Sequence, residues 1–505
     1  ALDSMNAGTA KDNTAIGYDA LTANTTGSAN VGIGASALKT NTTGGGNVAV
    51  GKDSLLANTT SNYNTAVGYY AMYANTTGAD NTTVGGRALV TNSTGNYNTA
   101  LGYSALEKNT VDANTGVGYK ALEENTTGVN NTALGAYAAD DSTTGNNNTA
   151  IGRAALGANT TGNDNTAVGY KALDAITTGY CCVGVGNSAL GANTANHNTA
   201  VGFEALMSNT TSPSNNAFGS GALKTNTTGG SLCAFGNSAL TANTTASYNS
   251  AFGRDALKSN TTGANNTAVG SGSLVANTTG TDNSAIGVNA LTANTTASYN
   301  TAVGSGALDA NTTGTSNVSI GFKALTANTT TSNSVAVGYK SLEDNTGANN
   351  TAVGSQTLRE NTTGTSNVAV GRDALEANTT GANNTAIGYY ALTSNTTANH
   401  NTAVGNQSLE ANTTGAQNVA VGKGALEANT TANNNTAIGY LALQTNTTGA
   451  GNVAVGRDAL LANTDANYNT AVGYNALTAN TTGERNIAIG NAALEANTTA
   501  DNNTA

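Results

Sequence analysis

The sequence predicts an all-β fold, a parallel β-solenoid or β-roll of 29 tandem coils of about 17 residues each. Three observations predict it: a glycine recurs at a short fixed interval, a strand-like N-T-A-V-G motif precedes each glycine, and changes in coil length fall in one segment. Self-similarity at such a period is typical of solenoids, in which each coil buries its apolar face by stacking on its neighbours.

The period is read from the glycine that begins at Gly17 and recurs at Gly34, Gly51 and onward to Gly490. These are 29 glycines separated by 28 intervals, of which 25 are 17 residues long and three are 16. The consensus is N-T-A-V-G-Y-x-A-L-x-A-N-T-T-G-x-x, and positions are numbered below from its first Asn. We expect residues 1–505 to form a single continuous repeat array.

The second to fourth positions predict a strand. The second is mostly β-branched and compact, the fourth is always bulky and apolar, and the third is nearly always small, as in Thr14, Ile16 and Ala15. Alternate residues of a strand share a face. We therefore expect the second and fourth positions to line the interior and the third to face outward.

Three further positions predict how the coil closes. The fifth is Gly in every copy, which fits a corner with positive φ. The ninth is Leu in 27 copies, with Met72 and Ala139 as exceptions, and predicts a second apolar stripe of the core. The first is Asn in 26 copies, replaced by Cys182, Leu232 and Ser334, and stacked Asn side chains would hydrogen-bond along the solenoid.

The second half of the coil allows two interpretations. Its buried eighth, ninth and twelfth positions have near-helical spacing, and Ala, Leu, Glu and Lys favour helix. However, coils paired through strands rise about 4.8 Å, whereas packed helices need 8–10 Å. We expect a second short strand or one tight turn, and the alternative is a curved solenoid of strand plus short helical turn.

The segment after the twelfth position is predicted to be a surface turn. The three short intervals lose their residue there, at Asn109-Thr110-Val111, Asn193-Thr194-Ala195 and Asn345-Thr346-Gly347. A residue lost from a paired strand would flip the side chains beyond it, whereas a turn tolerates the loss.

Composition excludes several classes of function. Only 9% of residues are charged and there is no Trp, so the core must be thin and built from small and β-branched residues. The net charge of −11 leaves no basic surface for nucleic acid. No run approaches the ~18 apolar residues of a membrane span. The chain begins at Ala1 without a leader, so we expect any export signal to be removed or to lie outside it.

Residues suited to catalysis or metal binding do not converge, so we expect no enzyme activity, no catalytic residue, no cofactor and no metal site. His197 and His400 occupy the seventeenth position about twelve coils apart. Acidic residues at the tenth position are expected to form a solvated face: Glu107, Glu123, Glu376, Glu410, Glu427 and Glu495.

The three cysteines form neither a C-x-x-C pair nor a disulfide framework. Cys182 and Cys233 lie three coils apart, about 14 Å at ~4.8 Å per coil, which is too far for a bridge. We expect Cys233 to be a core substitution and Cys181 a turn residue.

Repeated polar and aromatic positions suggest three other roles. Asn24-Thr25-Thr26 and its copies are formal N-glycosylation sequons. Ranks of Thr suggest ice binding, although adjacent Thr25 and Thr26 would point to opposite sides of an extended strand. Tyrosines at the sixth position and in the turn would pack over the coil or offer sugar- or protein-binding faces: Tyr18, Tyr69, Tyr103, Tyr119, Tyr170, Tyr63, Tyr97, Tyr248 and Tyr299.

The N-[ST]-[AV]-[VI]-G run, as in Asn64-Thr65-Ala66-Val67-Gly68 and Asn486-Ile487-Ala488-Ile489-Gly490, resembles the YadA-like head repeats of trimeric autotransporter adhesins and similar repeats of bacteriophage tail fibres. The resemblance covers the whole chain. It implies a left-handed parallel β-roll, a homotrimer with the third position near its axis, and a role in surface attachment. The coil is longer than the 14 or so residues common in that family, and no neck, coiled coil or membrane anchor is visible.

These observations favour a structural shaft of an extracellular or cell-surface adhesin, or of a virion fibre, that binds a receptor or glycan. The alternatives are a self-assembling extracellular filament subunit and an ice-binding solenoid. Because no polar repeat caps either end, we expect a segment of a longer fibre, about 130 Å long at ~4.8 Å per coil.

Overall fold

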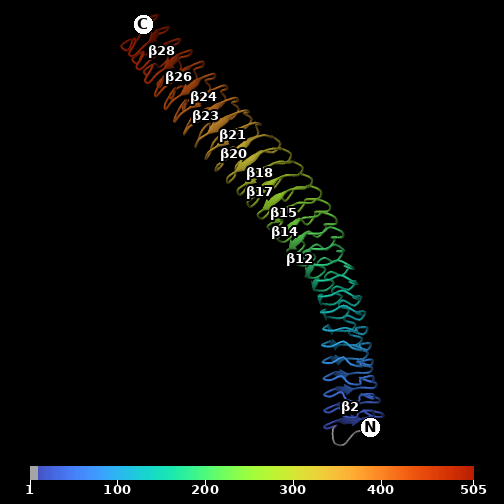
Figure 1. Ribbon diagram of the computed structural model, residues 1–505. Coiled ribbons are helices and arrows are strands. Elements are labelled where there is room, and N and C mark those ends of the chain that lie inside the picture. Colours follow the sequence, from blue (N-terminus) through green and yellow to red (C-terminus); the bar gives the residue numbers. More distant parts are fainter. Residues whose placement is uncertain (1–9) are drawn as a thin grey trace. The chain divides into compact units, whose positions relative to one another are not determined.

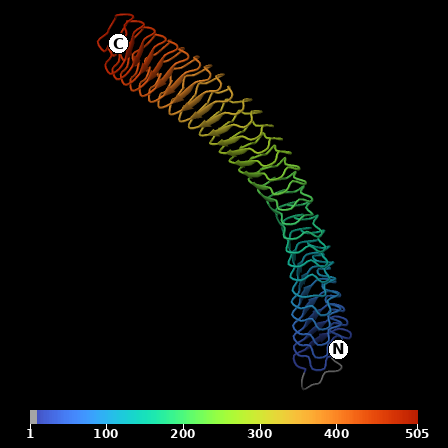
Figure 2. The same ribbon diagram turned by 45° about the horizontal axis from the view of Figure 1, so that its top comes forward.

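The computed structural model describes residues 10–505, so the start of the chain at Ala1 lies outside it. The described chain is all-β and winds as a parallel β-solenoid whose coils follow one another in sequence order (Figures 1 and 2). It divides into two compact units, one ending at Asn249 and the other beginning at Ser250. The predicted fold class is confirmed.

Each coil contributes one strand of three residues, from its second to its fourth position. The strands of the first unit are β1 (Thr14–Ile16), β2 (Val31–Ile33), β3 (Val48–Val50), β4 (Thr65–Val67), β5 (Thr82–Val84), β6 (Thr99–Leu101), β7 (Thr115–Val117), β8 (Thr132–Leu134), β9 (Thr149–Ile151), β10 (Thr166–Val168), β11 (Val183–Val185), β12 (Thr199–Val201), β13 (Asn216–Phe218) and β14 (Cys233–Phe235). Those of the second unit are β15 (Ser250–Phe252), β16 (Thr267–Val269), β17 (Ser284–Ile286), β18 (Thr301–Val303), β19 (Val318–Ile320), β20 (Val335–Val337), β21 (Thr351–Val353), β22 (Val368–Val370), β23 (Thr385–Ile387), β24 (Thr402–Val404), β25 (Val419–Val421), β26 (Thr436–Ile438), β27 (Val453–Val455), β28 (Thr470–Val472) and β29 (Ile487–Ile489).

Within each unit every strand pairs in parallel with the next, position for position. The register survives the three short coils: Thr99 pairs with Thr115, Val183 with Thr199, and Val335 with Thr351. The lost residue is therefore absorbed in the turn, as predicted.

The two faces of the strand are opposite to the prediction. The third position is buried in β2–β29, while the second and fourth positions are half-buried or exposed. A Cβ added to Gly32 would lie 3.3 Å from the Leu21 side chain, so the third position faces the ninth-position Leu across the coil. The coil is thin, and a small residue opposite Leu fills it without overlap. The ninth-position stripe itself is confirmed, with Leu21 through Leu477 fully buried where Leu is present.

The fifth-position glycine forms the corner after each strand. At Gly388 φ is +145°, and a Cβ there would lie 2.3 Å from the carbonyl oxygen of Gly405 in the next coil. Both the backbone conformation and the close approach of the neighbouring coil exclude a side chain, as predicted.

The second half of the coil is a tight turn, and the described residues contain no helix, so the helical alternative is wrong. The seventh and ninth positions have positive φ, as at Ser36 (57°) and Leu38 (50°). The N–H groups of these two positions bond to opposite neighbours: Ser36 N donates to Tyr18 O (2.8 Å) in the preceding coil, and Leu38 N donates to Ser54 O (3.1 Å) in the following coil. Bonds to both adjacent coils offset the roughly 1 kcal/mol cost of a left-handed Leu.

Two buried ladders of Asn hold the turn. At the first position the Asn30 Oδ1 accepts from Asn47 N (3.0 Å), while Asn47 Nδ2 donates to Ser61 O (2.8 Å). At the twelfth position Asn41 Nδ2 donates to Asn24 Oδ1 (2.9 Å) and to Gly44 O (3.0 Å). The first ladder confirms the predicted stacking. The second ladder is a series of hydrogen bonds from one side chain to the next, which satisfies a second row of buried amides.

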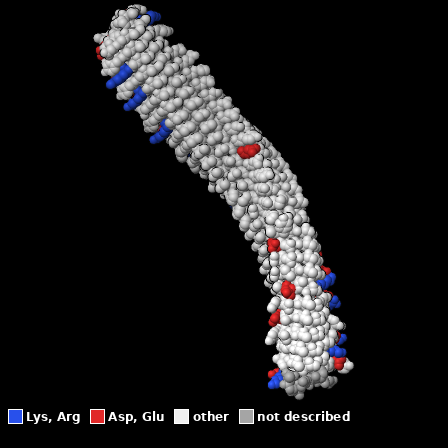
Figure 3. All heavy atoms as spheres, in the orientation of Figure 1, with Lys and Arg blue, Asp and Glu red and all other residues white. Residues whose placement is uncertain are grey.

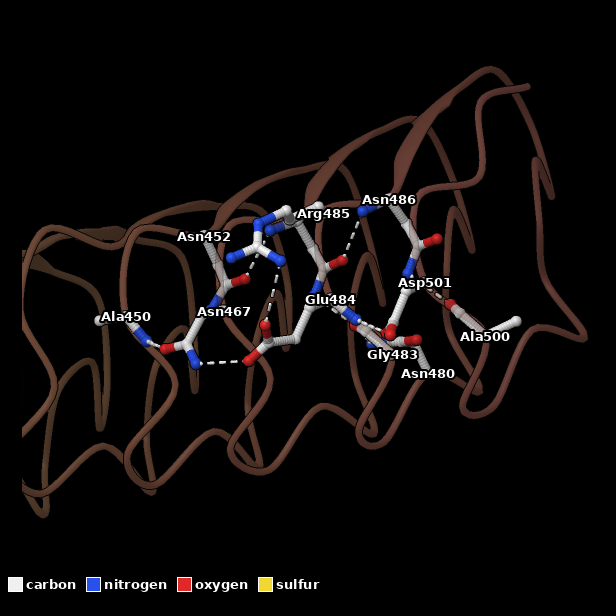
Figure 4. A network of polar contacts seen from close by, with 11 residues as sticks. Ala450, Asn452, Asn467, Asn480, Gly483, Glu484, Arg485, Asn486, Ala500 and Asp501 are labelled. Carbon is white, nitrogen blue, oxygen red and sulfur yellow. Dashed lines mark hydrogen bonds and ion pairs between the residues drawn. The ribbon is translucent and has the colours of Figure 1, made fainter.

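A more exposed polar row follows the sixteenth position, as Figure 4 shows near the C-terminus. Asn467 accepts from Ala450 N (2.8 Å) and donates through Nδ2 to Glu484 (2.8 Å), and Glu484 N donates to Asp501 (2.7 Å). Each of these coils is thus joined to the next by side chains as well as by backbone.

Candidate interaction surfaces

The outer face of the sheet is an uncharged stripe in both units. It consists of the second positions, mostly Thr or Val, and the fourth positions, which are Val, Ile, Leu or Phe in every coil. Neither rank contains an ionisable carboxylate or amine. Phe218 and Phe235 stack face to face with ring centroids 4.5 Å apart, so the fourth-position rank is apolar, while the second-position rank carries Thr hydroxyl groups in most coils.

Aromatic and basic residues border the stripe at the sixth position. Tyr103 stacks on Tyr119 (5.8 Å between centroids). Arg457 lies over the rings of Tyr440 and Tyr474, at 5.6 and 5.8 Å. Charged groups are isolated spots on the surface seen in Figure 3. The border therefore adds aromatic contact area, and its basic residues include Arg372 and Arg457, each paired with the Asp that follows it.

Three tyrosines of one coil line a cavity of about 430 Å³ in the first unit. Its walls are Tyr69, Tyr70, Tyr73, Arg87 and Val90. The Tyr69 and Tyr70 rings meet edge to face at 4.3 Å, and the Tyr70 and Tyr73 rings lie 5.0 Å apart. The sequence singled out Tyr69 alone. The run Y-Y-A-M-Y from residue 69 would have signalled the cluster, because the sixth, seventh and tenth positions lie on one edge of the turn.

A second cavity, of about 510 Å³, lies on the corresponding edge in the second unit and is polar. Glu410 and Glu427 line it together with Gln407, Gln444 and neighbouring residues. Gln444 Nε2 donates to Glu427 Oε2 at 2.7 Å. The site therefore presents carboxylates without an aromatic side chain.

Four other tenth-position acids have a partner within the repeat. Glu107 pairs with Arg87, Glu123 with Lys120 (3.0 Å) and Glu376 with Arg359 (3.0 Å), while Glu495 accepts from Asn475 (3.3 Å). Asp140 occupies the same position, and burial together with the nearby Asp141 and Glu123 raises its pKa to about 6. The acids at this position thus form ion pairs or hydrogen bonds, or are half-buried as Asp140 is.

The histidines and cysteines lie apart from the cavities. His197 and His400 are exposed in the turn, and His197 meets the Tyr180 ring edge to face at 5.0 Å. All three cysteines are free thiols; Cys181 is exposed in the turn, as predicted, and Cys182 is buried. Cys233 begins β14 on its outer face and is half-buried. Its assignment to the core was wrong because the faces of the strand were reversed.

The sequon asparagines are buried and hydrogen-bonded, as Asn24 and Asn41 show, so the folded chain does not offer them for glycosylation. In the Thr-Thr pair, Thr25 Oγ1 donates to Thr42 O (3.0 Å) of the next coil. The turn tyrosines Tyr63 and Tyr97 are 70% and 67% exposed, so the turn covers only a third of each.

Among residues 10–505 there is no group of three or more His, Cys, Asp or Glu placed to hold a metal ion. Nor does this part of the chain contain a helix long and apolar enough to cross a membrane. No family model and no curated protein matches the sequence.

Proposed function

We propose that the chain is a structural shaft of an extracellular or cell-surface adhesin, or of a virion fibre, whose copies associate through the outer face of the sheet. The observation that supports this is the uncharged stripe of the second and fourth positions with its apolar fourth-position rank, which repeats coil after coil and stays half-buried or exposed throughout residues 10–505. Extended apolar patches on a soluble surface are typical of interaction sites.

The size of the stripe is adequate for a stable contact. Fourteen strands of three residues, at ~4.8 Å between strands and ~3.3 Å per residue, make a face of about 600 Å². The two units together therefore offer about 1,200 Å². In a trimer each chain shares this face between two neighbours, about 600 Å² apiece, at the lower end of the roughly 600–1,000 Å² per partner of stable interfaces. A homotrimer around this face is the assembly we propose.

Sedimentation of the purified chain tests the proposal. A discrete trimer near three times 49.6 kDa is expected, and indefinite polymers would favour the filament alternative. Replacing Val421 and Val455 of the fourth-position rank with Lys would place charges in the contact and should yield monomers.

The matched control adds the same two charges away from the sheet. It is Tyr299→Lys with Tyr468→Lys, because both tyrosines lie in turns of the same unit and are 64% and 61% exposed. This variant should sediment as the wild type does. A wild-type chain that stays monomeric at tens of micromolar overturns the proposal.

One observation favours ice binding as a second candidate. Thr65 lies beside Thr82 and Val67 beside Val84 on the outer face of the sheet, so hydroxyl and methyl groups form two ranks, the first interrupted where Val replaces Thr. The relevant pair is Thr-x-Val of the strand and not the adjacent Thr-Thr of the turn. Inhibition of ice recrystallisation by the wild type, lost on Thr385→Lys with Thr402→Lys, is the expected result. Growth of ice at the buffer rate would exclude this candidate.

A further inference from the structure

The tyrosine cavity differs from the rest of the repeat in the coil that carries it. That coil holds tyrosines at its sixth, seventh and tenth positions, and Met72 replaces the buried ninth-position Leu beneath them. The next coil has Gly86 at the sixth position, so no side chain from that position stacks on Tyr69. Tyr69 remains 53% exposed at the mouth of the cavity.

The charges around the cavity favour a neutral ligand. Arg87 forms an ion pair with Glu107 in the next coil, so neither an isolated cation nor an isolated anion faces the cavity. Lys52 lies 5.8 Å from the centre of the Tyr69 ring, which disfavours a cationic guest. A side-chain hydrogen bond with Tyr69 raises the pKa of Tyr70, so its hydroxyl stays protonated and polar at neutral pH.

The shape favours a compact ring over an extended chain. The volume of about 430 Å³ is near the lower end of the ~300–1,000 Å³ range of small-molecule sites. Its walls span two coils only. Aromatic faces pack against the C–H face of a sugar ring, while the Arg87 guanidinium and the phenol hydroxyls match its ring of hydroxyl groups.

The second tyrosine pair of the chain provides an internal comparison. Tyr389 and Tyr390 repeat the sixth and seventh positions, with ring centroids 4.0 Å apart. Their coil has Thr393 where the first has Tyr73, and the next coil has Gln407 where the first has Arg87. The adjacent cavity is lined by carboxylates and amides without an aromatic wall.

We propose that Tyr69, Tyr70, Tyr73 and Arg87 form a binding site for a neutral hexopyranose unit of a glycan. The site deepens the attachment role proposed above and rests on that role for its biological partner, while binding itself is a property of the single chain.

Saturation-transfer NMR on the full chain tests the site, with methyl glycosides of galactose, glucose and mannose as probes. Tyr70→Asn with Tyr73→Thr is the variant, because other coils already carry these residues, at Asn289 and Thr292. Tyr474→Asn is the matched control, since Tyr474 is a sixth-position tyrosine outside the cavity with 49% exposure. Circular dichroism verifies that all three chains fold.

The expected result is transfer to the ring C–H protons of at least one sugar, weakened about tenfold or more in affinity in the double variant and unchanged in the control. No transfer from any sugar, or equal transfer in the double variant, overturns the site. Transfer to a proline-rich peptide alone would assign the cavity to a protein partner and also overturn it. Sedimentation of the same samples reports on the shaft separately, so a failure of either proposal leaves the other measurable.

Discussion

The twelfth-position ladder is continuous in one region of the molecule and broken in another. From Asn260 to Asn497, within the second unit, every coil carries Asn at this position. In the first unit the ladder is interrupted at Ser142 and Ile176. We refer to residues 260–497 as the continuous coils and to residues 139–182 as the interrupted coils.

The interruption leaves polar atoms without partners. Three buried side-chain oxygens have no hydrogen-bond partner: Asn125 Oδ1, Ser142 Oγ and Asn159 Oδ1. Ser142 is too short to reach Asn125, and Ile176 offers no donor to Asn159. In the same stretch Ala139 replaces the ninth-position Leu and Cys182 replaces the first-position Asn.

The comparison shows that the repeat tolerates the loss of side-chain hydrogen bonds between coils as long as the backbone hydrogen bonds between coils remain. β8, β9 and β10 keep their parallel register through the interrupted coils. Because a solenoid sums nearest-neighbour terms, the interrupted coils should be the place where the first unit opens most readily. Hydrogen exchange followed by mass spectrometry measures that opening coil by coil.

The largest expected effect is common to both regions. Gly388→Ala in the continuous coils places a Cβ 2.3 Å from a carbonyl oxygen of the next coil. Gly152→Ala in the interrupted coils places one at 2.5 Å, and both glycines have positive φ. Each should lower the local opening free energy by about 3 kcal/mol or more. Gly86→Ala is the control, since Gly86 does not have a positive φ and the nearest atom to its Cβ would be 3.5 Å away, an ordinary contact. A small effect at either glycine would mean that close backbone packing between adjacent coils does not stabilise both regions.

The next largest effect concerns the core stripe. Leu409→Ala in the continuous coils should cost about 2–5 kcal/mol, because the buried side chain leaves a cavity. Leu409→Met should cost less than about 1.5 kcal/mol, as the Met72 coil suggests. Ala139→Leu should stabilise the interrupted coils. Urea unfolding of the three variants provides the measurement, and equal losses for Ala and Met would contradict a packing origin.

Exchanging Asn and Ser at the twelfth position tests directly whether the ladder sets the difference in stability between the two regions. Asn412→Ser should destabilise the continuous coils by about 1–3 kcal/mol, because Asn395 Oδ1 loses its donor. Ser142→Asn should stabilise the interrupted coils by about 1 kcal/mol through a new bond to Asn125. Exchange protection should move in opposite directions in the two variants. Movement in the same direction would show that the ladder does not set the difference.

The smallest effect is the pH dependence that Asp140 contributes in the interrupted coils. Burial raises the pKa of Asp140 from 3.8 to about 6, so the folded chain binds this proton more tightly than the unfolded chain. The contribution of Asp140 to stability therefore falls as the pH rises from about 4 to about 6, and then levels off. Asp140→Asn should stabilise the chain at pH 7 and have little effect near pH 4. The urea midpoints of both chains at the two values test this, and an unchanged difference would contradict it.

The sequence predicted those elements of the repeat in which a structural requirement restricts a position to one residue type. The invariant glycine predicted a corner, the Leu column a core stripe, the first-position Asn a ladder, and the three short intervals a turn; the structure confirms each of them. The prediction of the strand faces is wrong, because side-chain bulk alone favours the second and fourth positions for the interior. The tyrosine cavity was missed because Tyr70 and Tyr73 lie in a turn whose side-chain directions depend on its alternating φ values.

Period, strand position and coil number were therefore set by the sequence alone, since each recurs in register along the chain. Which face of the strand is inside was decided only by the tertiary structure. Alternation distinguishes two faces but is symmetric between them, and the choice depends on how much room the opposing Leu leaves across a thin coil. In this protein that room holds Ala, Gly or Ser in every coil except one, where Thr83 is buried, so the bulky rank lies outside.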